Sequence, residues 1–119
     1  MSVVVPHFSP CRSAGDLVFV SGQLPFGPER KVVGADIREQ TMQCLANIAA
    51  ILQKQGLGLE HVVKTTVWLR RVEDFAAFNA AYAEGFPIEP PARSTVRADL
   101  MVDALVEIEA VAVRPSSLR

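Results

Sequence analysis

Cysteine is scarce in this sequence. The 119 residues include two cysteines, Cys11 and Cys44, which are too few for the disulfide framework of a small secreted domain. Neither cysteine forms a metal-binding pattern with the two histidines, His7 and His61. We therefore expect free thiols, no metal site and a cytoplasmic location.

Long apolar runs and an excess of charge of one sign are also missing. No apolar run approaches the length of a membrane span, about 18 residues, and the first residues lack the pattern of a secretory leader. The 12 basic and 13 acidic side chains give a net charge of −1, without a basic cluster that could follow a phosphate backbone. We expect neither a membrane nor a nucleic acid as a partner.

The composition that remains is that of a soluble globular protein, with 50% hydrophobic and 21% charged residues. A chain of this length can bury about two-thirds of its unfolded surface. No internal repeat or linker interrupts the sequence, so we expect one domain over residues 1–119.

Five segments have the short length, the β-branched content and the turn boundaries of strands. They are Val3–Val5, Leu17–Gln23, Lys64–Leu69, Pro90–Arg97 and Leu105–Val113. Pro6 marks the first segment as an edge strand, whereas the second is apolar on both faces as far as Ser21 and is expected in the centre of the sheet. Gly22 then permits either the close approach of a ligand or a bulge. Residues 25–34 are expected to form a hairpin-like loop.

The longer of two predicted helices begins at Asp36. Asp36 and Glu39 have the spacing of a capping box, and apolar side chains then recur at helical intervals as far as Gly56. Cys44 falls on this apolar stripe. A packed thiol is therefore a much simpler interpretation of Cys44 than a nucleophile.

The second helix begins at Glu73-Asp74, ends near Gly85 and is expected to bury Phe75, Phe78 and Tyr82. The order strand, strand, helix, strand, helix, strand, strand predicts an α+β fold with two helices on one face of the sheet. Several strands carry apolar residues on both faces, so the uncovered face needs another partner. The simplest partner is a second copy of the chain, and we expect a homo-oligomer.

Four charges stand on the last two predicted strands. Arg93 and Arg97 share one face of the first, and Glu107 and Glu109 share one face of the second. If the two strands are neighbours, all four charges meet on one face, and cross-strand ion pairing is the simpler interpretation for Arg97 with Glu109. Arg93 follows the rigid diproline Pro90-Pro91, so its guanidinium suits bidentate capture of a carboxylate, whether from a ligand or a neighbour.

Five motifs along the chain occur together in one protein family. They are Leu17–Gln23, Val63–Val67, Asn79–Tyr82, Pro91–Ser94 and Val106–Ala110. In this order they resemble the RidA family, the reactive intermediate deaminases also called the YjgF family. Pro-Ala-Arg-Ser and Val-Glu-Ile-Glu-Ala are specific when found together, and the resemblance covers nearly all of the chain.

This resemblance implies a chorismate-mutase-like α+β fold, in which a mixed sheet carries two helices packed on one face. It also implies a homotrimer with three pockets between subunits, and no metal or organic cofactor. The implied partner is a small imino or keto acid. The implied activity is hydrolysis of 2-imino acids, of the 2-iminopropanoate and 2-iminobutanoate type, to 2-keto acids and ammonia.

The resemblance also assigns roles to residues. Arg93 matches the arginine that binds the substrate carboxylate, and Glu107 matches the glutamate that positions the attacking water. The other substrate-binding positions of the family fall on Phe8, Ser21, Gly22 and Thr95. Phe8 stands where members often have a tyrosine, and Thr95 where many have a cysteine.

Two loops, 83–92 and 99–104, are shorter than in the well-studied members, which concerns the substrate range rather than the fold. Two alternatives use the same fold: a regulatory protein that binds small carboxylates, and a deaminase or hydrolase of another metabolite. Some members are described as ribonucleases, but the near-neutral charge of this chain argues against that activity.

Overall fold

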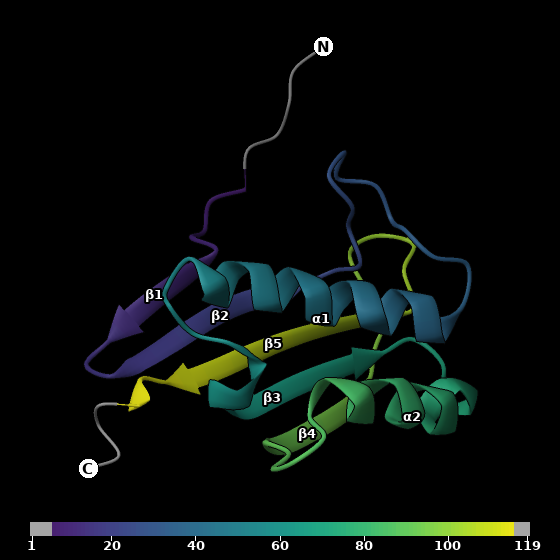
Figure 1. Ribbon diagram of the computed structural model, residues 1–119. Coiled ribbons are helices and arrows are strands. Elements are labelled where there is room, and N and C mark those ends of the chain that lie inside the picture. Colours follow the sequence, from purple (N-terminus) through teal and green to yellow (C-terminus); the bar gives the residue numbers. More distant parts are fainter. Residues whose placement is uncertain (1–5, 116–119) are drawn as a thin grey trace.

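The computed structural model of the protein describes residues 6–115, which form a sheet with two helices across one face (Figure 1). The elements are β1 (Cys11–Ala14), β2 (Leu17–Gln23), α1 (Ile37–Gln53), β3 (Val62–Leu69), α2 (Phe75–Gly85), β4 (Ala92–Arg97) and β5 (Val106–Val113), with short 3-10 turns at Leu59–His61 and Val72–Asp74. The strand expected at Val3–Val5 lies outside the described residues. None of the helices described is long and apolar enough to cross a membrane.

The sheet has the order β1-β2-β5-β3-β4. Its central strand β5 is antiparallel to both neighbours, whereas β4 pairs in parallel with β3. Parallel neighbours need a long crossover, and α2 supplies it between β3 and β4. The mixed sheet with two helices on one face confirms the predicted α+β fold.

Alternation along the strands builds the core between sheet and helices. On β5, Val106, Ile108, Ala110 and Ala112 are buried beneath α1, while the residues between them are partly exposed on the other face. Cys44 on α1 is fully buried and its thiol lies 3.8 Å from the carbonyl oxygen of Val106. Burial raises the pKa of this thiol, so the prediction of a packed and unreactive Cys44 is confirmed.

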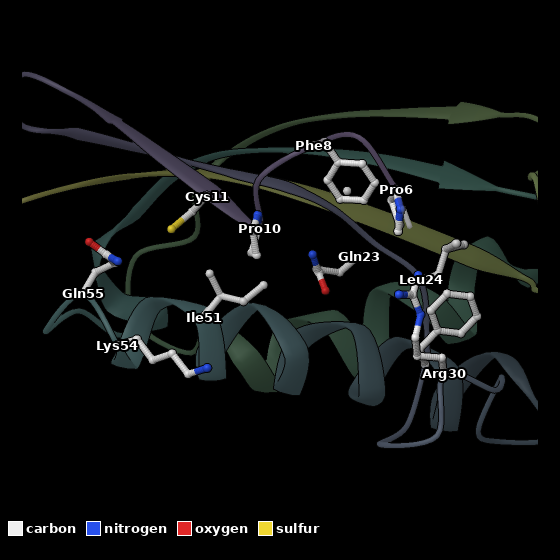
Figure 2. A pocket seen from close by; sticks show the side chains of 12 residues that line it. Pro6, Phe8, Pro10, Cys11, Gln23, Leu24, Arg30, Ile51, Lys54 and Gln55 are labelled. Atoms are coloured by element: carbon white, nitrogen blue, oxygen red, sulfur yellow. The ribbon is translucent and has the colours of Figure 1, made fainter. Parts of the chain in front are cut away.

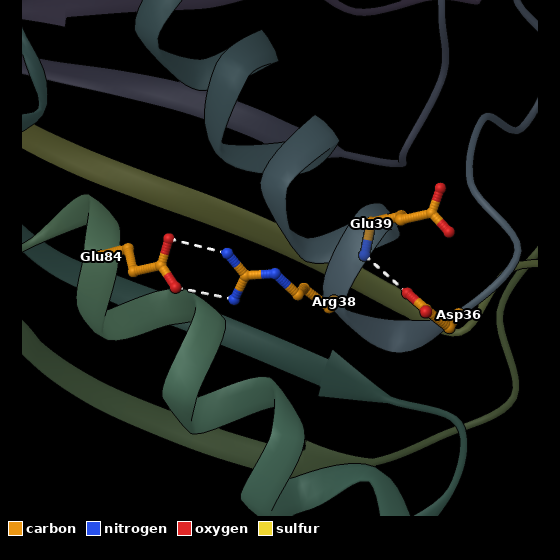
Figure 3. Close-up of polar contacts among 4 residues, drawn as sticks. All are labelled: Asp36, Arg38, Glu39 and Glu84. Carbon is orange, nitrogen blue, oxygen red and sulfur yellow. Dashed lines mark hydrogen bonds and ion pairs between the residues drawn. The ribbon is translucent and has the colours of Figure 1, made fainter.

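The start of α1 follows its predicted cap (Figure 3). The carboxylate of Asp36 accepts a hydrogen bond of 2.8 Å from the backbone N–H of Glu39. In the same first turn, Arg38 forms a bidentate ion pair with Glu84 of α2, at 2.6 and 2.9 Å. The helix ends at Gln53, earlier than expected, and Gly56 takes a φ of 74° in the turn that follows.

Strand β1 was not among the predicted strands. Cys11–Ala14 pairs antiparallel with Leu17–Val20 around the turn at Gly15, and most of its side chains are exposed. A Cys-Arg-Ser-Ala segment has no apolar alternation, which is the signal on which strand prediction depends. The strand forms because its backbone can pair with the edge of β2.

The sheet face opposite the helices is uncovered within the subunit. Leu17, Phe19 and Val96 lie on it with 38%, 44% and 47% of their surfaces exposed, and Trp68 lies between them on β3. The prediction that the sheet is apolar on both faces is therefore confirmed. We call this surface, together with the outward side chains of β5, the uncovered face.

Candidate functional site

The predicted site residues fall into two groups within the subunit. Glu107 on β5 stands opposite Trp68 and points to the uncovered face. Arg93 on β4 stands opposite the buried Thr65, on the face that the helices cover. Because β3 lies between β4 and β5, the expectation that these two strands are neighbours is wrong. The physical reason is the crossover through α2, which places β4 beside β3 at the sheet edge.

The predicted ion pair between Arg97 and Glu109 is absent for the same reason. Arg97 lies on the helix face at the sheet edge, and Glu109 lies on the uncovered face beside Thr66. Over residues 6–115, the ion pairs are Arg38–Glu84 and Arg70–Asp103. The four charges therefore do not form a cross-strand network within one subunit.

The first group is built around Gly22 and Glu107. The pairing of β2 with β5 shifts register between Val20 and Gln23, so Gly22 lies in an irregular stretch of the strand. A Cβ added at Gly22 would lie 2.5 Å from Oε2 of Glu107. Gly22 therefore lies at an irregular point of the strand pairing. Because it has no side chain, the Glu107 carboxylate can approach its backbone closely.

The environment of Glu107 favours its protonated form. Partial burial raises the pKa of this carboxyl, and the nearby negative charge of Glu109 raises it further. A carboxylate with a raised pKa is a stronger base in the neutral range than an ordinary glutamate. This chemistry suits a group that takes a proton from water.

Ser21 ties the segment before β1 to β2. Its hydroxyl donates a hydrogen bond of 2.6 Å to the carbonyl oxygen of Ser9, and its backbone N–H donates to that of Pro10 at 2.9 Å. Phe8, one residue further back, is 63% exposed. The serine hydroxyl thus has a structural partner, while the Phe8 ring is free for contact with another molecule.

A cavity of about 710 Å³ lies between this segment, the 24–33 hairpin and the C-terminal half of α1 (Figure 2). Its walls include Phe8, Gly22, and apolar side chains of α1 and the hairpin, among them Ile51 and Leu24. Two cations, Arg30 and Lys54, also line it, and its described walls contain no carboxylate. Such a cavity suits an anion with an apolar body.

The hairpin wall of this cavity is fixed to α1. Asn47 donates hydrogen bonds of 3.1 and 3.0 Å to the carbonyl oxygens of Leu24 and Phe26, and Gln43 donates to that of Phe26 at 3.2 Å. Arg30, at the tip, has a φ of 59°, which a non-glycine residue adopts only at a cost. The predicted hairpin-like loop is confirmed, and it holds a cation at the cavity.

The second group is built around Arg93 on the edge strand β4. The carbon of its guanidinium lies 4.9 Å from the ring centroid of Tyr82 and 5.4 Å from that of Phe78, both on α2. Within residues 6–115 it has neither an ion pair nor a hydrogen bond through its side chain. Arg93 also borders an open hollow of about 460 Å³, together with Asn79 and Pro91. Its N–H groups are thus free to bind a carboxylate.

Thr95 follows two residues after Arg93 on the same face of β4. Its Oγ1 atom is buried and has no hydrogen-bond partner among the residues described. A buried hydroxyl without a partner is uncommon and costs free energy unless something else completes it. Arg93 and Thr95 together offer a cation and a hydroxyl at one sheet edge.

The profile of the family described as Endoribonuclease L-PSP matches residues 3–114. The chain belongs to this family. The match spans all five motifs on which the resemblance to the RidA proteins rested, and both groups of site residues.

Relatives within the family are similar over most of their lengths. The 2-iminobutanoate/2-iminopropanoate deaminase of Escherichia coli is 44% identical over 105 residues, which cover 84% of this chain and 81% of that protein. A Lactococcus lactis protein named as a candidate regulator, AldR, is 44% identical over 98 residues, covering 81% and 78%. The crystal structure of E. coli TdcF with bound serine has a TM-score of 0.87 at 34% identity, covering 93% of this chain and 91% of that one.

Three residues of the candidate site, in two places, were not predicted from the sequence. Asn79 borders the hollow beside Arg93, and its position three residues before Tyr82 on α2 was the available signal. Arg30 and Lys54 were missed because nothing in the sequence relates the hairpin tip to the end of α1. Within residues 6–115, no three His, Cys, Asp or Glu side chains are grouped as metal ligands.

Proposed function

We propose that this protein is a hydrolytic deaminase that converts 2-imino acids, of the 2-iminopropanoate and 2-iminobutanoate type, into 2-keto acids and ammonia. The observation that carries this proposal is the state of Arg93. Its guanidinium rests against aromatic rings but has no carboxylate partner in the part of the chain described. A fork with free donors fits the carboxylate that every 2-imino acid carries.

The two groups of residues face different sides of one subunit, so we propose that they meet between subunits. The uncovered face supplies the apolar surface that such an assembly buries. We propose a homotrimer with closed cyclic symmetry. Each of its three pockets would join Arg93 and Thr95 of one subunit to Phe8, Ser21, Gly22 and Glu107 of the next.

In this pocket the Arg93 fork holds the substrate carboxylate and so fixes the imine carbon. Glu107 accepts a proton from a water molecule as the water oxygen bonds to that carbon. The imine nitrogen is already protonated, so the electron pair of the C=N bond moves to it without forming an anion, which gives a neutral carbinolamine. General-base action of this kind contributes about 10²–10⁴-fold, and holding both reactants in place contributes further.

The carbinolamine then collapses to the products. Glu107 returns its proton to the nitrogen and then takes the proton of the carbinolamine hydroxyl as the C–N bond breaks and the carbon–oxygen double bond forms, which releases ammonia and the 2-keto acid; Glu107 passes that last proton to solvent. One water is consumed and no electrons are exchanged with another molecule. The free thiols of Cys11 and Cys44 agree with a cytoplasmic site for this reaction.

Two relatives support the proposal. The E. coli protein named as a 2-iminobutanoate/2-iminopropanoate deaminase is 44% identical to this chain. E. coli TdcF binds serine in its crystal structure, and serine presents a carboxylate beside a nitrogen-bearing carbon, as a 2-imino acid does. Neither similarity fixes the side chain of the substrate.

The direct test generates the imine in place. Threonine dehydratase releases 2-iminobutanoate, and we expect the protein to accelerate the formation of 2-oxobutanoate and ammonia when it is added to that reaction. Arg93→Ala should give no acceleration while its oligomeric state and thermal unfolding stay close to those of the wild type. If the wild-type protein leaves the rate unchanged over a wide range of concentrations, it is not a deaminase of this imine.

A second candidate function is regulation through the binding of a small carboxylate. The cavity beside Phe8, with Arg30 and Lys54 and no carboxylate in its described walls, favours this candidate. So does the name of the Lactococcus lactis relative AldR. Saturable binding of 2-oxobutanoate without acceleration of imine hydrolysis would support the regulator.

A further inference from the structure

Three aromatic rings of one helix surround the guanidinium of Arg93. Its central carbon lies over the rings of Tyr82, Phe78 and Phe75, at 4.9, 5.4 and 5.7 Å from their centroids. A cation within about 6 Å of a ring centroid is attracted by the negative charge on the ring face. We call Phe75, Phe78 and Tyr82 the aromatic cradle.

The cradle is itself held rigidly. Phe78 is fully buried and Tyr82 is 5% exposed, and their centroids lie 5.3 Å apart. The Tyr82 hydroxyl shares a hydrogen bond of 2.6 Å with Thr65 Oγ1, and both side chains are buried. Thr65 is also the residue of β3 that pairs with Arg93 in the sheet. Thr65 therefore fixes both the position of the Tyr82 ring and the position of β4 at Arg93.

Rings hold a guanidinium differently from a carboxylate. A carboxylate partner would accept hydrogen bonds from the N–H groups of Arg93 and would compete with any anion that approaches. The rings attract the cation without consuming the in-plane donors as a carboxylate does. In residues 6–115, no carboxylate pairs with Arg93.

We propose that the aromatic cradle positions Arg93 for the substrate carboxylate, and that Phe75 is the residue of the cradle that tunes the affinity. This inference rests on the proposed function, because it assigns Arg93 a carboxylate ligand. Phe75, Phe78 and Tyr82 act through Arg93 and are positioning residues. A cradle of this kind favours substrates with a carboxylate next to the imine carbon over imines without one.

Phe75 separates this role from core packing. Phe78 and Tyr82 are buried, so replacing either of them also disturbs the core. Phe75 is 43% exposed at the start of α2, and its replacement costs little packing. Phe75→Leu keeps an apolar side chain but removes the ring, whereas Phe75→Tyr keeps the ring.

The test compares these two variants with the wild type and with Val72→Ala, which removes a neighbouring exposed apolar side chain that carries no ring. The readouts are the Kd for 2-oxobutanoate, the separate kcat and KM of imine hydrolysis, and the NMR shifts of the Arg93 side chain. A ring face shifts nearby protons upfield, so these signals report the cradle without any ligand.

We expect Phe75→Leu to raise the Kd and the KM by about 2- to 5-fold, the range of an exposed cation–π contact. Its kcat should change less than about 2-fold, because Arg93 holds the carboxylate equally before and during the reaction. The Arg93 signals should move downfield. Phe75→Tyr and Val72→Ala should stay near the wild-type constants.

Three other results have distinct meanings. An unchanged Kd in Phe75→Leu, with wild-type binding intact, overturns the cradle and leaves the proposed function standing. A weakened Kd in a protein that never accelerates imine hydrolysis supports the cradle and removes the deaminase. A wild-type protein that does not bind 2-oxobutanoate overturns both.

Discussion

Glu107 and Glu109 lie two residues apart on the uncovered face of β5, and the pKa of Glu107 is raised. Burial is the larger cause of that shift and the charge of Glu109 the smaller one. The two carboxylates therefore have different roles although they share a strand face. Glu107 is the proposed base, and Glu109 makes it a stronger one.

Glu109→Gln tests this relation between the neighbours. Removing the negative charge should lower the pKa of Glu107, because its ionised form is no longer repelled. Activity requires ionised Glu107, so the acid limb of the kcat/KM profile should move to lower pH. Glu60→Gln, on the surface near α2, is the control and should leave the profile in place. An acid limb that moves upward would contradict the assignment.

Glu107→Gln tests the base itself. We expect the Kd for 2-oxobutanoate to stay within a few-fold and the turnover to fall by at least ~10²-fold, the usual scale for a general base. If turnover survives while Glu109→Gln abolishes it, the two roles are reversed.

The stability of the protein should also respond to Glu107. A raised folded pKa means that the folded state holds its proton to higher pH than the unfolded chain, where the pKa is about 4.3. The stabilising contribution is therefore complete below about 4.3 and is lost as pH rises through the folded pKa. Urea unfolding of Glu107→Gln should show a flatter pH dependence across this window. A steeper dependence would mean that the pKa is lowered rather than raised.

At the scale of the elements, short-range sequence patterns correctly predicted the elements that depend on interactions within a few residues. The cap at Asp36 and the alternation of Val106–Val113 act within a few residues, and both α1 and β5 lie where the sequence placed them. Strand β1 escaped prediction because Cys11–Ala14 gains its pairing from β2 rather than from its own side chains. The neighbour of β4 was mispredicted although the intervening helix α2 is typical of a parallel pair.

The capping interaction of α1 provides a stability prediction. Asp36→Ala removes the acceptor for the Glu39 N–H and should lower the free energy of unfolding by about 1 kcal/mol. Arg38→Ala, which breaks the ion pair with Glu84, should lower the free energy of unfolding less than Asp36→Ala does, because both side chains of the pair are half exposed. Urea unfolding measures both. If Arg38→Ala costs more, the link between α1 and α2 matters more than the cap.

At the scale of the molecule, the uncovered face is the largest feature that one subunit leaves without an explanation. Phe19 lies on this face and is 44% exposed, and the proposed trimer would bury it. Phe19→Glu should therefore dissociate the assembly in sedimentation experiments at micromolar concentration. Ile88→Glu places the same charge on a loop position that is 92% exposed and should leave the trimer intact. A wild-type protein that sediments as a folded monomer would contradict the assembly.

The sequence predicted Arg93 and Glu107 as site residues but not their arrangement, nor the neighbouring Asn79, Arg30 and Lys54. Arg93 and Glu107 would share a face if β4 and β5 were neighbours, but their registers with β3 place Arg93 on the helix face and Glu107 on the uncovered face. The reason is that motifs record residue types, whereas strand order depends on contacts between distant segments. A site shared between subunits agrees with both the motifs and the strand order, since Arg93 of one subunit can then face Glu107 of another.

Mixed trimers test this shared site most directly. Arg93→Ala and Glu107→Gln should each be inactive alone. When the two variants are unfolded together in equal amounts and refolded, six of the eight possible cyclic arrangements contain both subunits, and each of these has one intact pocket. We expect about a quarter of the wild-type deaminase rate to return. If the mixture stays as inactive as its parents although mixed trimers form, Arg93 and Glu107 do not act in a pocket between subunits.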